Sequence, residues 1–64
     1  MNNTEQTREE CNALLAAMLG NSLAQDMWWR APNKHFCGDT PEQIFSVSPR
    51  LVLNYLWKCA EGEW

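Results

Sequence analysis

The chain has 64 residues, which is enough for one domain near the lower size limit at which a single hydrophobic core is sufficient. A hydrophobic fraction of 45% indicates a folded globule rather than a disordered chain. The net charge is −3, from five basic and eight acidic residues, and this balance disfavours nucleic-acid binding, which requires a basic surface.

The N-terminal sequence MNNTEQTREE has neither the basic segment nor the apolar run of a secretory signal. No apolar run approaches the ~18 residues that a membrane span needs. The three cysteines, Cys11, Cys37 and Cys59, are odd in number and widely spaced. We therefore expect a cytoplasmic protein of a bacterium, or of its host cell if a phage encodes it, with reduced and buried thiols.

The first helix is expected to begin at Thr7, because T-R-E-E forms a capping box in which Glu10 returns to the Thr7 amide. Residues 1–6 are expected to be frayed. Gly20 is placed to end the helix in a left-handed conformation. Between these ends, apolar residues recur at the spacing of one helix face: Cys11, Leu14, Leu15, Met18 and Leu19.

A second short helix is expected over residues 23–29, after an S-x-x-Q box at Ser22. Pro32 disfavours the helical conformation at the residue before it and ends this helix. We interpret Trp28 as a core residue. Trp29 lies about 100° further around the helix and is expected on a different face.

A third, very short helix follows, with Thr40 as N-cap, Pro41 at the first helical position and Gln43 completing a capping box. The last helix is expected from Pro49 to about residue 60. Its polar residues form one narrow stripe: Arg50, Asn54, Lys58 and Glu61. The remaining positions are apolar, more than so small a domain can enclose, so we expect a partner on this helix.

No segment alternates as a strand does, and residues 7–64 are predicted to form one all-α domain, a small compact bundle of about four helices, two of them short. His35 and Cys37 are a close pair of metal-ligand types, but a zinc site needs four ligands. The carboxylates lie mainly at helix starts, where they stabilise the helix dipole. We expect no catalytic residue, no metal and no cofactor.

Trp57 and Trp64 are the best candidates for exposed anchors, because Trp is among the residues that most often carry interface energy. A frayed tail is an equal alternative for Trp64. The expected partner contact consists of Arg50, Asn54, Trp57, Glu61, Glu63 and Trp64.

The middle of the chain carries a recognisable pattern. Its residues are Trp28, Trp29, Pro32, Asn33, Phe36, Gly38, Thr40 and Pro41, followed by Val52, Leu56, Gly62 and Trp64. This resembles the toxin-binding domain of Xre/MbcA/ParS-type bacterial antitoxins. Members of that family show a pattern close to W-L-x-x-P-N-x-x-L-x-G-x-T/R-P. An apolar helix follows the pattern and ends in Gly and an aromatic residue. The resemblance covers roughly residues 13–64, and the loop matches without gaps.

Physical chemistry gives the loop positions a structural role. Asn33 can hydrogen-bond its own backbone and fix the turn, and Gly38 supplies a conformation closed to other residues. Phe36 would then pack the loop onto the core.

The resemblance implies a binding module. Family members sit against a RES-type toxin that degrades NAD, and their C-terminal end reaches toward the mouth of its active site. Full antitoxins carry a helix-turn-helix ahead of this domain, whereas only about one helix precedes it here, so operator binding is not expected. Trp29 replaces the usual Leu and a second Trp lies at Trp57, so the partner surface is expected to differ.

Three hypotheses follow. The leading one is a non-enzymatic protein that neutralises a RES-type toxin by capping its active site. The alternative is a small phage-encoded inhibitor of a host defence effector, similar to an anti-CRISPR. It would act by binding, or by imitating nucleic-acid phosphates with its acidic residues: Asp26, Asp39, Glu42, Glu61 and Glu63. The third is a homodimer or larger homo-oligomer that pairs through the last helix.

Overall fold

The computed structural model describes residues 3–62. Within this range the protein is all-α, with four α-helices, one short 3-10 helix and no strand. The elements are α1 (Asn3–Leu19), α2 (Ser22–Arg30), η1 (Lys34–Phe36), α3 (Pro41–Val47) and α4 (Pro49–Ala60). The predicted bundle of four helices, with two short ones, is confirmed.

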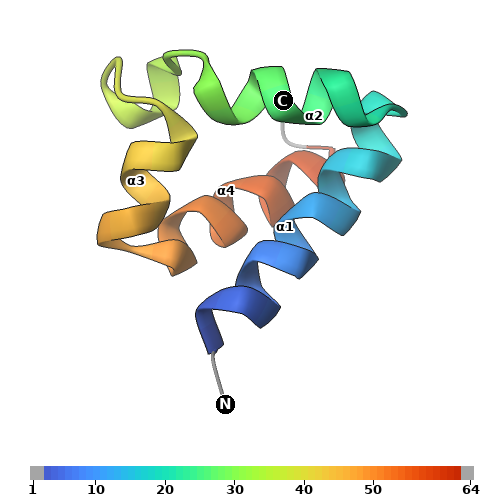
Figure 1. The fold of residues 1–64 in the computed structure, drawn as a ribbon, viewed down its shortest axis with the longest axis horizontal. Helices are drawn as coiled ribbons and strands as arrows, with labels where there is room; N and C mark the ends of the chain where they lie inside the picture. Colours follow the sequence, from blue (N-terminus) through green and yellow to red (C-terminus); the bar gives the residue numbers. More distant parts are fainter. Residues whose placement is uncertain (1–2, 63–64) are drawn as a thin grey trace.

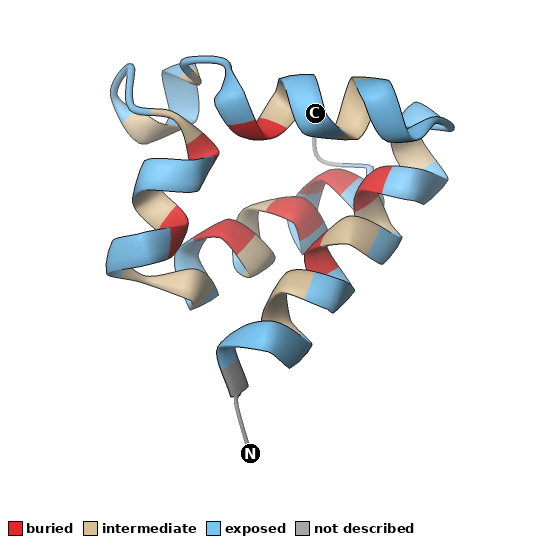
Figure 2. Ribbon diagram, in the orientation of Figure 1, coloured by how far each residue is buried: buried red, intermediate tan, exposed pale blue. Residues whose placement is uncertain are grey.

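The helices surround one small core. In Figure 1, α2 runs across one side, α1 and α3 leave from its two ends, and α4 closes the opposite side. α4 packs against α1 and α3, and α2 packs against the same two helices. Figure 2 shows that the buried residues lie on the inward faces of these helices.

Helix α1 begins at Asn3, one turn before the predicted start at Thr7. The four residues ahead of Thr7 contain no Pro or Gly to oppose a helix. Glu5 lies in the first turn, where a carboxylate stabilises the helix dipole. The predicted capping box at Thr7 is therefore wrong, because this residue lies inside the helix.

Helix α2 starts from Asn21 rather than from the predicted box at Ser22. The Asn21 side chain accepts a hydrogen bond from the Ala24 amide at 2.7 Å, and Ser22 is the first helical residue. The helix ends at Ala31, which is extended (φ −88°, ψ 139°) as its position before Pro32 requires.

Two other predicted helix ends are confirmed. Gly20 ends α1 with φ +85°, and its amide donates to the carbonyl of Ala16 at 3.0 Å. At the start of α3, the Gln43 amide donates to Thr40 Oγ1 at 3.1 Å, and the Thr40 amide donates to Gln43 Oε1 at 2.9 Å. This reciprocal pair is the predicted capping box.

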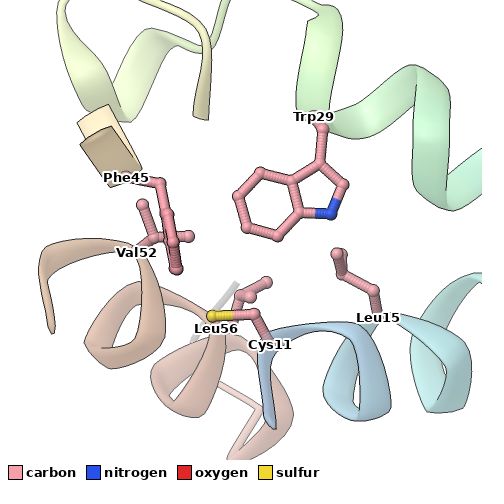
Figure 3. Close-up of a cluster of buried hydrophobic side chains, with 6 residues drawn as sticks. All are labelled: Cys11, Leu15, Trp29, Phe45, Val52 and Leu56. Atoms are coloured by element: carbon pink, nitrogen blue, oxygen red, sulfur yellow. The ribbon is translucent and has the colours of Figure 1, made fainter. Parts of the chain in front are cut away.

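The core centres on Trp29, which is only 3% exposed. Six buried side chains converge there from all four helices (Figure 3): Cys11, Leu15, Trp29, Phe45, Val52 and Leu56. Trp28, which the sequence predicts as a core residue, packs against this cluster from its edge. The face of α2 that meets α1 and α3 passes through Trp29, and Trp28, one position earlier, is only partly buried.

Arg8 closes this core from outside. Its guanidinium carbon lies 3.7 Å from the Trp29 ring centroid. The same guanidinium donates two hydrogen bonds to Glu42, at 3.1 and 3.2 Å. The Trp29 indole N–H donates to Asn12 Oδ1 at 2.9 Å, and its ring meets Phe45 edge to face at 5.5 Å. One arginine thus joins α1 to residues of α2 and α3.

Replacing Arg8 by Ala is expected to lower the free energy of unfolding by about 1–3 kcal/mol, because it removes a cation–π contact and a bidentate ion pair together. Urea denaturation followed by Trp fluorescence measures this change. Arg50→Ala is the matched control and should change stability by less than about 0.5 kcal/mol, since Arg50 is exposed. Equal effects of the two substitutions would contradict the role of Arg8.

The cysteines do not share one environment. Cys11 and Cys59 are buried as predicted, but Cys37 is exposed, so the prediction of three buried thiols is wrong. Cys37 follows η1 in a left-handed conformation (φ 58°), on a loop that leaves its side chain in solvent. Burial raises the pKa of the Cys11 thiol from 9.0 to about 11, against an opposing effect of the nearby Arg8 cation.

The raised pKa of Cys11 predicts a loss of stability at alkaline pH. The unfolded chain releases this proton from about pH 9, whereas the folded chain holds it until about pH 11. The protonated Cys11 thiol therefore makes its full contribution to the free energy of unfolding below pH 9, and this contribution is lost as the pH rises toward 11. Urea titrations at pH 7 to 11 should show this decline, and Cys11→Ala should reduce its slope. Cys37→Ala, at the exposed thiol, should leave the slope unchanged.

Candidate partner-binding groove

Helix α4 presents a continuous outer face to solvent. Four of the predicted contact residues are exposed along it, three on the helix and one at its C-cap: Arg50, Asn54, Trp57 and Glu61. Their spacings of four, three and four residues place them along one side of a helix. The two other predicted contact residues, Glu63 and Trp64, lie outside the described residues. The opposite face of α4 is buried through Val52, Leu56 and Cys59.

A groove of about 770 Å³ runs between this helix and the loop that contains η1. Its volume falls within the range of about 300–1,000 Å³ typical of ligand sites. Five of its lining side chains are large and apolar or aromatic: Phe36, Ile44, Leu51, Tyr55 and Trp57. The other five lining residues carry polar groups or a thiol, two from α4 and three from the loop: Asn54, Lys58, His35, Cys37 and Asp39.

Tyr55 joins the two walls of the groove. Its ring centroid lies 4.8 Å from that of His35 and 5.3 Å from that of Phe36, and it stacks on Trp28 at 6.4 Å. The His35 ring therefore packs against an aromatic side chain, and Phe36 is partly buried as expected. Burial and the neighbouring Cys59 thiol raise the pKa of Tyr55, against an opposing effect of a hydrogen bond with the Asn33 side chain.

The loop wall is fixed by Asn33, as the sequence predicts. Its side chain accepts from the His35 amide at 2.9 Å, and its carbonyl accepts from the amides of Phe36 and Gly38 at 3.0 Å. Its own amide donates to the carbonyl of Asp39 at 3.0 Å. Gly38 has φ +88°, a conformation that side-chain residues rarely adopt, which confirms its expected role.

Two apolar side chains on the groove remain largely in water: Leu51 is 55% exposed and Trp57 is 49% exposed. Sequence reasoning identified Trp57 but missed Leu51 and Tyr55. A signal for Leu51 was available, because it lies about 100° from Arg50 and three residues before Asn54, beside the polar stripe. No local pattern indicates that Tyr55 meets the loop.

Comparison with known proteins identifies no relative: no protein-family model, curated protein or solved structure matches the chain. Within residues 3–62, no group of three or more His, Cys, Asp or Glu side chains gathers as a metal site. The helices in that range include none with the length and apolar character needed to cross a membrane.

Replacing Tyr55 by Ala is expected to release the loop wall and to lower the free energy of unfolding by about 3–4 kcal/mol, because three ring contacts are lost. Tyr55→Phe keeps the ring and should lose about 1 kcal/mol or less. Urea denaturation measures both values, and amide hydrogen exchange at Phe36 and Gly38 reports loop opening. Unchanged exchange in Tyr55→Ala would contradict a loop held by this ring.

Proposed function

We propose that the protein is a small binding module that inhibits a partner protein through the outer face of α4 and the adjoining groove. The observation that carries this proposal is the pair of half-exposed apolar residues, Leu51 and Trp57, on the walls of a largely apolar groove. Apolar surface of this kind gains about 25 cal/mol for each Å² removed from water, and grouped exposure often marks a binding site.

In its more specific form, the proposal is an antitoxin-like domain that caps the active site of a RES-type NAD-degrading toxin. The support for the toxin is the sequence resemblance alone. The geometry supports the manner of binding, because the motif residues Asn33, Phe36 and Gly38 build the wall beside the α4 face. A cap of this type blocks access and requires no reacting group of its own.

Acidic imitation of nucleic acid has less support. Two of the carboxylates it would use already face cations of the same chain: Asp26 lies 3.5 Å from the Arg30 side chain, and Glu42 holds Arg8. Paired carboxylates present a weaker field to a basic effector than unpaired ones. The apolar groove is therefore the better basis for a function.

The decisive experiment measures binding and inhibition of purified RES-type toxins, with NAD hydrolysis as the readout. We expect the wild type to bind and protect NAD, and Trp57→Ala to weaken binding at least about 30-fold, as loss of a hot-spot residue does. Leu23→Ala is the matched control, because Leu23 is 69% exposed on α2 and does not line the groove. Circular dichroism should show that both variants remain folded.

Two outcomes would contradict the proposal at different levels. If the wild type binds none of the RES-type toxins tested, the antitoxin assignment is wrong. If it binds one of them and Trp57→Ala behaves like Leu23→Ala, the toxin is right but the α4 face is not the contact.

A further inference from the structure

We infer that the groove receives an amphipathic, acidic segment of the partner, which inserts an apolar side chain between Leu51 and Trp57 and places carboxylates along α4. This inference rests on the proposed function, in that the outer face of α4 binds a protein. It adds the chemistry of the segment that binds there.

The distribution of paired and unpaired cations is the first support. Arg8 and Arg30 are both held by carboxylates of the chain. The other basic side chains of the described region form no ion pair within it: Lys34, Arg50 and Lys58. All three lie on α4 or on the loop across the groove, and Lys58 lines the groove itself. Of the three, Lys58 lines the apolar groove, whereas Arg50 lines a separate hollow with residues of α1 at the start of the same helix.

The spacing along α4 is the second support. Arg50, Asn54 and Lys58 follow one another at four-residue intervals, which places them about 6 Å apart along the helix axis. A partner helix repeats its own side chains at the same interval, so carboxylates two turns apart on it match the spacing of Arg50 and Lys58. Asn54 between them can donate or accept a hydrogen bond.

Two carboxylates of this protein lie beside the groove and limit how the partner segment can be oriented. Asp39 lines the loop wall of the groove, and Glu61 follows the end of α4. An acidic partner is repelled by both, so its carboxylates must face Arg50 and Lys58 with its apolar side chain toward the groove. The arrangement therefore selects one orientation of the bound segment.

Helix α1 of a second copy, the most acidic helix of the chain, does not supply such a segment. Helix α1 is acidic through Glu5, Glu9 and Glu10, but its apolar side chains Cys11 and Leu15 are buried in its own core. The large apolar residue that α1 does expose, Leu19 (39%), lies nine residues beyond Glu10, so α1 does not present this side chain beside its carboxylates. We therefore exclude α1 of a second copy, and on the charges beside the groove we assign it to a different protein.

A displayed library of random 16-residue peptides tests the chemistry even while the partner is unidentified. Selection on the wild-type protein should enrich peptides that carry a large apolar residue and an excess of Asp and Glu over the starting library. One selected peptide is then synthesised and its Kd is measured by fluorescence anisotropy at low and high salt. Affinity should fall as the salt concentration rises.

Variants of opposite expected effect make the test specific. Lys58→Gln should weaken binding of the selected peptide about two- to fivefold, the range for loss of one exposed ion pair. Asp39→Asn should strengthen it, because a repulsive charge is removed. Arg30→Gln, on α2 and paired with Asp26, is the control and should leave Kd unchanged.

The inference is overturned if no peptide is enriched, if the enriched peptides show no acidic excess, or if Lys58→Gln and Asp39→Asn do not change Kd. These failures can be separated from failure of the proposed surface. If Trp57→Ala abolishes peptide binding while the charge variants have no effect, the α4 face stands and the acidic chemistry is wrong. If Trp57→Ala also has no effect, both are wrong.

Discussion

The fold depends on how one indole ring is surrounded. Trp29 projects from α2 into the core, where Arg8 of α1 covers one part of the ring and Phe45 of α3 meets it edge to face. Its only polar atom donates to Asn12 of α1. The ring thus supplies much of the buried area and also leaves no polar group unpaired, which is the condition for burying a Trp at low cost. Glu42 then fixes the arginine, so three helices are held at one point.

This arrangement determines what α4 can bury. The core filled by Trp29 and Phe45 leaves room only for one face of α4, through Val52 and Leu56. A domain of 64 residues has too little volume to enclose a helix that is apolar on most sides. The remaining apolar residues of α4, including Leu51 and Trp57, therefore lie outside the core. The exposed surface is a consequence of the same packing that stabilises the fold.

Features set by neighbouring residues could be predicted from the sequence, and features set by distant packing could not. The capping box at Thr40, the end of α2 before Pro32 and the left-handed Gly38 depend on a few adjacent residues. Trp28 and Trp29 have almost the same local sequence, and only the position of α2 over α1 and α3 decides which is buried. The outer face of α4 followed from helical spacing. The loop wall of the groove could not be predicted from helical spacing, because it depends on the contact of Tyr55 with residues about twenty positions earlier.

The groove is built from parts that are already held in place, and this affects how it can recognise a partner. Asn33 fixes the loop wall by backbone hydrogen bonds, and the buried face of α4 fixes the other wall. A preformed site loses less conformational entropy on binding than a disordered one, so less of the energy of the apolar contact is offset. Selectivity then depends on the few charges at the edge. Lys58 and Asp39 line the groove together with opposite charges, so each disfavours a like charge placed beside it.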